Sequence, residues 1–216
     1  MRFSDKTASI PERLIALQEK GEIVFLCGAG ISMRYDLPSF RRLTELVYQE
    51  LGETWTGHAA EEEAMGFGPD GKEKGPAALD RALFALAKRL RGDDPASRIR
   101  AERAITEAVE KHLKAPAITF AAHADVWALS RDAEMRGRVV TTNFDALFEH
   151  ATTSDVPSRA GPDLPPPLGS DFWGVLHLHG RIADGDRDLS RTGLVLNSAE
   201  FGEAYLRGWL GSALCL

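Results

Sequence analysis

Three short runs of the sequence carry residue types that can do chemistry: GAGIS at residues 28–32, TTNFD at 141–145 and HLHG at 177–180. Each run follows a short apolar stretch of the kind that forms a buried strand. Parallel strands bring their carboxyl ends to one edge of a sheet, where open α/β sheets bind their ligands. We therefore expect the three runs to form one site.

The GAGIS run suits the binding of an anion. Gly28 and Gly30 lack a Cβ, so the backbone can turn tightly and a pyrophosphate can approach it, with Ala29 between them. A helix after the loop would offer free N–H groups and the positive end of its dipole, and Ser32 adds a hydroxyl donor. A plain tight turn is the alternative, because the third glycine of the dinucleotide fingerprint is absent and Glu50 matches its acidic residue only loosely.

Asn143 and His179 are the residues best suited to catalysis. A side-chain amide both donates and accepts, so Asn143 can hold a ribose hydroxyl or a water. His179 can take a proton from such a group near neutral pH, and a general base of this kind contributes about 10²–10⁴ in rate. His177 lies two residues earlier, on the same side of a strand, which raises the alternative of a metal pair. We expect no metal, because no third ligand follows at a suitable spacing.

The wider context of GAGIS resembles the cofactor loop of sirtuins, in which GAGIS is followed by a few variable residues and then Gly-Ile-Pro-Asp-Phe-Arg. The run DLPSFR at 36–41 keeps Pro38, Phe40 and Arg41, whereas Asp36 replaces the glycine and Ser39 the acidic residue. In sirtuins this loop closes over the nicotinamide side of NAD. The resemblance therefore implies that Phe40 and Arg41 contact the cofactor, and the alternative for Phe40 is a plain core position.

The other two runs resemble sirtuin motifs in the same order. TTNFD resembles Thr-Gln-Asn-Ile-Asp, with Thr142 at the glutamine position, and HLHG resembles the Leu-His-Gly motif whose histidine is the general base. His179 is the matching histidine, since it precedes the glycine. The resemblance implies that Asn143 and His179 are catalytic. It implies an NAD-binding set of Gly28, Ala29, Gly30, Ser32, Phe40, Arg41, Thr142 and Asp145.

The cysteines bear on which sirtuin activity to expect. Sirtuin deacylases usually carry a zinc module with four cysteines, whereas this chain has only Cys27 and Cys215. The resemblance is therefore to divergent prokaryotic sirtuin-like domains, which commonly hydrolyse NAD in anti-phage defence. We expect an NAD⁺ hydrolase that releases nicotinamide, with water as the nucleophile. An NAD-dependent protein deacylase and a non-catalytic module that senses NAD or a related nucleotide are the alternatives.

The elements that must position these residues alternate between strands and helices. Apolar patterns predict strands at 22–27, 138–142, 175–179 and 193–196, and helices at 10–20, 38–51, 76–90, 96–113, 119–129, 143–151 and 198–214. Residues 54–75, which are rich in Gly and Glu, are expected to contain loops, and the proline-rich residues 154–170 are expected to form a loop. The alternation predicts an α/β fold, a Rossmann-like doubly wound parallel sheet. We expect one domain over 1–216, with a helical insertion at about 54–113 and without the last strands of the sirtuin-like domain.

The bulk composition limits the class of protein and its partners. The chain has 216 residues, 44% of them hydrophobic, and a net charge of −6, which fits a soluble domain and disfavours direct binding of nucleic acid. The absence of a secretory signal and of a long apolar run, together with few cysteines, predicts a cytoplasmic location without membrane contact. The resemblance implies NAD⁺ as ligand and either a homo-oligomer or a complex with a defence partner, Argonaute-like or an ATPase.

Overall fold

The computed structural model describes residues 9–92, 94–114, 120–153, 155–161, 164–165, 172–185 and 189–207 of the chain. Its α-helices are α1 (Glu12–Glu19), α2 (Phe40–Glu50), α3 (Ala59–Ala64), α4 (Leu79–Leu90), α5 (Pro95–Leu113), α6 (Ala121–Ser130), α7 (Leu147–Ala151) and α8 (Ser198–Gly202). A 3-10 turn, η1 (Ser32–Tyr35), begins at the last residue of GAGIS, and a π-type turn, η2 (Glu203–Arg207), extends α8. The last residues of the segment predicted as a helix at 198–214 lie outside the described residues, and so does Cys215.

The strands form one parallel sheet. They are β1 (Phe25–Cys27), β2 (Arg138–Thr141), β3 (Ser158–Ala160) and β4 (Gly174–His177). Their order across the sheet is β1-β2-β4-β3, and each neighbouring pair is parallel. Helices flank the sheet, so the predicted α/β class with a Rossmann-like parallel sheet is confirmed.

Burial accounts for the consecutive apolar residues of the two central strands, β2 and β4. Val139 and Val140 on β2, like Val175 and Leu176 on β4, are at most 2% exposed. Consecutive apolar residues are needed there because both faces of a parallel sheet are covered. β1 lies at an edge of the described sheet, where Leu26 is 70% exposed.

Two local predictions were wrong. The short strand β3 lies inside the proline-rich segment predicted as a loop, and it pairs with β4. This pairing is possible because Gly174, at φ +108°, leaves room for the Pro157 carbonyl, which accepts from the Val175 N–H at 2.9 Å. Residues 193–196 form no strand: they run past His179, whose carbonyl accepts from the Val195 N–H at 2.9 Å. Residues 54–75 contain the expected loops, and between them lies the short helix α3.

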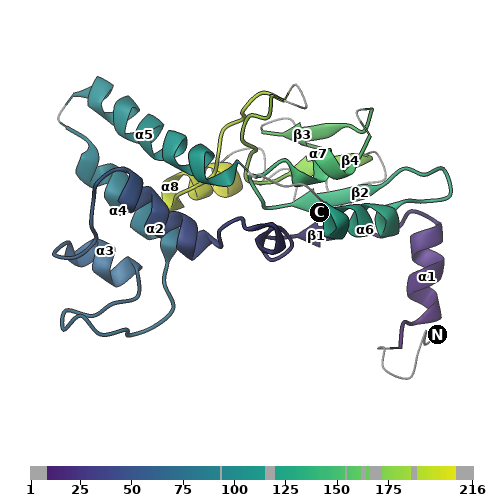
Figure 1. Cartoon of the computed structure of the whole chain (residues 1–216), viewed down its shortest axis with the longest axis horizontal. Coiled ribbons are helices and arrows are strands. Elements are labelled where there is room, and N and C mark those ends of the chain that lie inside the picture. The colour runs from purple at the N-terminus through teal and green to yellow at the C-terminus, as the bar shows by residue number, and fades with distance from the viewer. Residues whose placement is uncertain are drawn as a thin grey trace.

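Helices α2, α3, α4 and α5 form a second part of the molecule, the helical part, beside the sheet. In Figure 1, α2, α3, α4 and α5 lie to the left, the sheet lies to the right, and α8 lies between them. The amphipathic α2 begins at the side-chain cap of Ser39, which accepts from the Arg42 N–H, and buries Leu43 and Val47 against Leu86 of α4 and its neighbours. This helical part therefore has its own apolar core, which reaches the sheet through Phe144.

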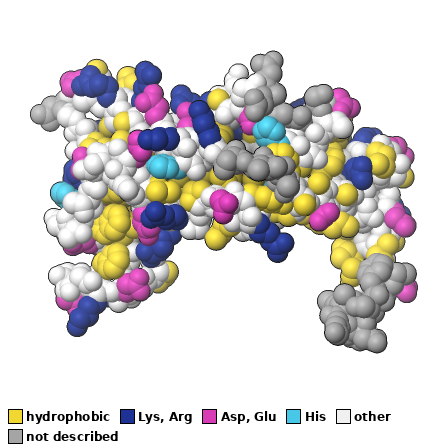
Figure 2. Space-filling model, in the orientation of Figure 1, with side chains coloured by type: hydrophobic (Ala, Val, Ile, Leu, Met, Phe, Trp, Pro, Cys, Tyr) yellow, Lys and Arg dark blue, Asp and Glu magenta, His cyan; other side chains and the backbone are white. Residues whose placement is uncertain are grey.

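The surface differs between the two parts. Figure 2 shows Lys, Arg, Asp and Glu side chains spread over the helical part, whereas hydrophobic side chains gather near β1 and α6. Leu26, Met33 and Leu129 are at least half exposed there. None of the described helices is both long enough and apolar enough to cross a membrane.

Candidate functional site

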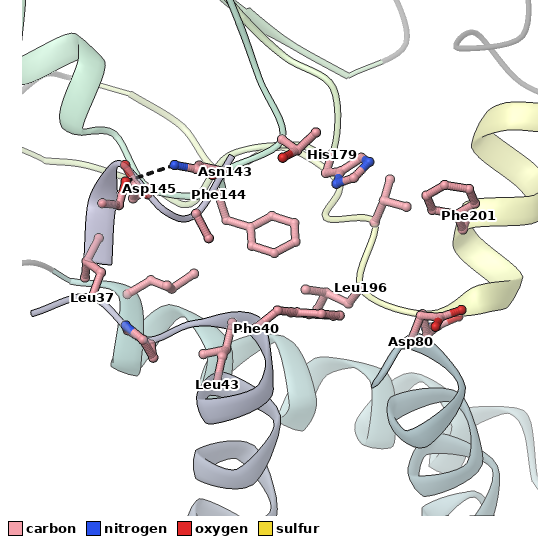
Figure 3. A pocket seen from close by; sticks show the side chains of 17 residues that line it. Leu37, Phe40, Leu43, Asp80, Asn143, Phe144, Asp145, His179, Leu196 and Phe201 are labelled. Atoms are coloured by element: carbon pink, nitrogen blue, oxygen red, sulfur yellow. Dashed lines mark hydrogen bonds between the residues drawn. The ribbon is translucent and has the colours of Figure 1, made fainter. Parts of the chain in front are cut away.

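A cavity of about 450 Å³ lies where the carboxyl ends of β1, β2 and β4 meet the helical part (Figure 3). All three sequence runs contribute to its wall. The polar residues that line it are Ser32, Asp80, Thr142, Asn143, Asp145, His179 and Asn197. The apolar residues that line it are Ala29, Leu37, Pro38, Phe40, Leu43, Leu113, Phe144, Val195, Leu196 and Phe201.

The two ends of this cavity differ in chemistry. Figure 3 shows Asn143 and Asp145 together at one end, with His179 further along the same side. Asp80 of α4 and Phe201 of α8 lie at the other end, and Phe40 faces the Phe144 ring across the middle. The lining includes two aspartates and neither lysine nor arginine. Such a cavity suits a flat, uncharged or cationic group better than an anion.

Asn143 is held in place at both its side chain and its backbone. Its Nδ2 donates to Ser32 Oγ at 2.9 Å, the bond drawn in Figure 3, and its backbone N–H donates to Thr141 Oγ1 at 3.0 Å. Its backbone carbonyl lies 3.0 Å from His177 Nδ1. The amide nitrogen is thus committed to Ser32. The amide oxygen is the group left to accept a hydrogen bond from a hydroxyl or water in the cavity.

Asp145 is a buried carboxylic acid at the same end of the cavity. It is 5% exposed, and its Oδ1 accepts from the Leu147 N–H at 3.1 Å as the chain enters α7. Burial raises the pKa of Asp145, and this effect outweighs the hydrogen bonds from Leu147 and Ser32. The residue can therefore hold a proton more readily than an exposed aspartate.

His179 lies among aromatic side chains. Its Nε2 is 2.8 Å from the Tyr205 hydroxyl, and the Phe144, Phe201 and Tyr205 rings surround its imidazole. Burial lowers the pKa of His179, although a hydrogen bond with the Thr142 backbone opposes the shift. A backbone carbonyl only accepts, so the ring nitrogen facing it carries the proton and Nε2 is left as the basic nitrogen. His179 is therefore neutral at physiological pH, as a general base must be.

A buried charged cluster lies directly behind Asn143. His177, which is fully buried, places Nε2 2.8 Å from Glu149 Oε1. Arg181 lies 3.5 Å from the same oxygen, and Ser158 bonds to both Glu149 and Arg181. Burial by itself raises the pKa of Glu149, but the charge of His177, hydrogen bonds from His177 and Ser158 and the charge of Arg181 together outweigh it and lower that pKa to about 2. The same attraction raises the pKa of His177 against the effect of burial.

Most of the sequence-predicted site residues meet at this cavity. Those that line it are Ala29, Ser32, Phe40, Thr142, Asn143, Asp145 and His179. Gly28 and Gly30 are exposed in the loop beside the cavity and are not part of its lining. Arg41 points instead to the helical part, where its Nη2 donates to the Met65 carbonyl at 3.4 Å.

The turn after GAGIS differs from the expected anion-binding helix start. The N–H of Ile31 donates to the Gly28 carbonyl, and those of Ser32 and Met33 donate to Ala29. These groups are used within a 3-10 turn, and the next helix, α2, begins only at Phe40. The loop therefore brings Ala29 and Ser32 to the cavity, whereas the start of α2 brings Phe40.

Sequence reasoning missed several residues around the site. His123 on α6 contacts Ser32, Glu149 on α7 pairs with His177, and Tyr205 contacts His179. Each lies on an ordinary amphipathic or buried helical pattern, which resembles a core position. The available signal was a His and a Glu inside otherwise apolar helical patterns, because such residues need partners when they are buried.

The comparisons with known proteins give one strong match. No family model matches the chain. The chain is 41% identical, over 218 aligned positions, to a protein of Sinorhizobium fredii (strain NBRC 101917 / NGR234) that carries the name "Uncharacterized protein y4cA". The match covers 97% of this chain and 16% of that relative, so the chain spans about a sixth of the relative's length.

Proposed function

We propose that this domain hydrolyses NAD⁺ and releases nicotinamide. The observation that carries the proposal is the convergence of Asn143, Asp145 and His179 on one largely apolar cavity at the carboxyl edge of a parallel sheet. Ligands of open α/β sheets bind at that edge. The order and spacing of the three runs, which resemble those of sirtuins, identify NAD⁺ as the ligand to test first.

The chemistry suits the residues present. Cleavage breaks the bond between the ribose C1′ and the cationic nicotinamide nitrogen, and the bond electrons leave with neutral nicotinamide. Water then bonds to C1′ and gives up a proton, so that NAD⁺ and water become ADP-ribose, nicotinamide and H⁺. The leaving group needs no acid, and the cavity lining contains Asp80 and Asp145 but no cationic side chain to oppose the positive ring.

Each residue has a role in this proposal. Asn143, with its nitrogen on Ser32, turns its oxygen to the attacking water or a ribose hydroxyl. His179 accepts the proton at Nε2, which requires the Tyr205 hydroxyl to give way or to pass the proton on. Phe40 and Phe144 exclude bulk water from the middle of the cavity.

The test is to incubate the purified protein with NAD⁺ and measure free nicotinamide and ADP-ribose. We expect release by the wild type and loss of at least about 10²-fold in kcat for Asn143→Ala and His179→Ala. His58→Ala, a histidine outside the cavity lining, is the matched control and should keep full activity. Full activity in either site variant would refute the assignment.

The same assay separates the alternatives. If the domain is a sensing module, calorimetry would detect NAD⁺ binding, yet no nicotinamide would be released in any oligomeric state. A deacylase would release nicotinamide only when an acylated lysine peptide is added, and would then form an acylated ADP-ribose.

The cellular role is proposed from the resemblance to anti-phage sirtuin-like domains. We propose that the domain depletes NAD⁺ as a defence effector, either as a homo-oligomer or beside an Argonaute-like or ATPase partner. Cellular NAD⁺ during phage infection should fall in cells that express the active protein. In cells that express His179→Ala it should not fall.

A further inference from the structure

His123 is a fully buried histidine on α6 that contacts the site from behind. Its ring packs between aromatic neighbours, with ring centroids 5.4 Å from Tyr35 and 4.7 Å from Phe148. The residue is 0% exposed, and its Nδ1 has no hydrogen-bond partner in the part of the chain that the structure describes. A phenylalanine would fill the same space without burying two nitrogens, so packing alone does not account for a histidine.

The remaining nitrogen of His123 points to the site. Nε2 lies 3.2 Å from Ser32 Oγ, which in turn accepts from Asn143 Nδ2 at 2.9 Å. Ser32 is 3% exposed and also bonds to the Asp145 carboxyl. One hydroxyl therefore joins His123 of α6 to Asn143 and Asp145 in the run that follows β2.

The hydrogen-bonding capacity of the Ser32 hydroxyl limits how these side chains can be arranged. A hydroxyl has one hydrogen and two lone pairs. Ser32 can donate to Asp145 and accept from His123, or donate to His123 and accept from Asp145. In both cases the last lone pair accepts from Asn143. His123 and Asp145 therefore determine the direction of the hydroxyl, and the hydroxyl determines which way the Asn143 amide is turned.

The protonation of His123 agrees with this role. Burial lowers its pKa to about 4, although the charge of Glu149 opposes the shift. The ring is therefore neutral at physiological pH and has one donor and one acceptor nitrogen. A neutral ring can hold Ser32 in either arrangement without placing a charge against the cavity.

We propose that His123 is a positioning residue, which fixes the Asn143 amide through Ser32 so that the amide oxygen serves the cavity. This inference rests on the proposed NAD⁺ cleavage for its effect on rate. The contact geometry itself does not depend on that function. His123 touches no substrate in this scheme and acts only through Ser32.

Two substitutions separate positioning from packing. His123→Phe keeps the ring packing against Tyr35 and Phe148 but removes both nitrogens. His123→Gln loses the ring but places an amide nitrogen close to the position of Nε2. If the role is positioning, His123→Phe should lose about tenfold in kcat, which is about 1.4 kcal/mol of transition-state stabilisation, with little change in KM. His123→Gln should keep most of the rate although it is the less stable variant.

A second readout needs no NAD⁺. The side-chain amide protons of Asn143, identified in NMR spectra by their loss in Asn143→Ala, should exchange slowly in the wild type. We expect exchange about tenfold faster in His123→Phe and near wild-type exchange in His123→Gln. Adding Ser32→Ala to His123→Phe should cause no further loss beyond Ser32→Ala alone, because both changes break the same chain of contacts.

The outcomes distinguish this inference from the proposed function. If the wild type releases no nicotinamide, the proposed function fails, and the exchange measurement alone decides whether His123 orders Asn143. Full kcat and slow exchange in His123→Phe would overturn the inference. So would fast exchange with an unchanged kcat, because ordering would then have no part in the reaction.

Discussion

At the scale of residues, the site depends on buried polar groups that hold one amide. Asn143 is bonded by Ser32 at its side chain and faces His177 at its backbone carbonyl. His177, which is fully buried, is in turn oriented by Glu149. Buried charges add little net stability as a pair, but leaving one partner alone is costly. We infer that the cluster is kept for geometry.

The first residue-scale prediction concerns Glu149. Glu149→Ala leaves His177 and Arg181 buried with the main counter-charge removed, and this should lower the free energy of unfolding by about 3–5 kcal/mol at pH 7. Urea titration would measure the loss. Glu107→Ala, which breaks the exposed Arg103–Glu107 pair, is the control and should change nothing measurable.

The same prediction has a pH signature. The pKa of Glu149 is lowered to about 2 in the folded protein. The contribution of Glu149 to stability is therefore fully present when the pH is above the ordinary pKa of a glutamate, and it is lost as the pH falls toward about 2. Glu149 also raises the pKa values of His177 and His123 against the effect of burial, so in Glu149→Ala the protonation of both histidines in the unfolded chain destabilises the fold more than in the wild type. The difference between wild type and Glu149→Ala should therefore widen as the pH falls through the ordinary histidine pKa of about 6.5, and narrow only below the ordinary pKa of a glutamate. A difference that does not narrow as the pH approaches about 2 would contradict the assignment.

At the scale of elements, the ends of three strands and the start of one helix make the site. GAGIS follows β1, TTNFD spans the end of β2, and HLHG spans the end of β4, while α2 brings Phe40 from the opposite side. Gly180, at φ +84°, ends HLHG and lets residues 193–196 cross behind His179. A glycine is required there by both the backbone conformation and the close approach of Gly193.

Two glycine substitutions test this view of the loops. At Gly180 a Cβ would lie 2.0 Å from the Gly193 carbonyl oxygen, so Gly180→Ala should lower the free energy of unfolding by about 3 kcal/mol or more. At Gly30 a Cβ meets nothing within 4 Å and φ lies outside the left-handed region, so Gly30→Ala should fold normally. If the NAD⁺ pyrophosphate lies over this exposed loop, Gly30→Ala should still raise KM about tenfold. An unchanged KM would show that the phosphates bind elsewhere.

At the scale of the whole molecule, the cavity lies between the sheet and the helical part, whose apolar core also includes Phe144, Ile182 and Leu196. The sheet supplies Asn143 and His179, and the helical part supplies Leu43, Asp80 and Leu113. A ligand that contacts both parts binds the folded chain and not the unfolded one. Binding should therefore stabilise the whole molecule, beyond the residues at the sheet edge.

A thermal shift tests this coupling. His179→Ala cannot turn NAD⁺ over in the proposed mechanism, so it can be saturated with ligand. At NAD⁺ concentrations about 100-fold above Kd, the free energy of unfolding should rise by about 2.7 kcal/mol in a single transition. Adenosine, which lacks the pyrophosphate and the nicotinamide, is the comparison ligand. Two separate transitions, of which NAD⁺ shifts only one, would show that the ligand does not bridge the two parts.

The sequence by itself determined the strands with continuous apolar runs and the polar residues at their ends. Val139, Val140 and Leu176 read as buried strand residues because both faces of a parallel sheet exclude water, and this physical requirement is visible locally. Asn143, Asp145 and His179 could be predicted to meet, since parallel strands share a carboxyl edge. The proline-rich context of β3 hid that strand, because its pairing depends on Gly174, distant in sequence.

Only the tertiary structure decided which partners hold the site. Arg41 matches a motif, yet it bonds to Met65 because α2 turns it toward the helical part. His123 matches none, yet α6 brings it to Ser32 across 91 positions of sequence. A buried hydrogen bond is fixed by the packing of whole helices against the sheet, and the local spacing of residues does not predict that packing. The sequence therefore identified the candidate residues, whereas only the tertiary structure identified their hydrogen-bond partners.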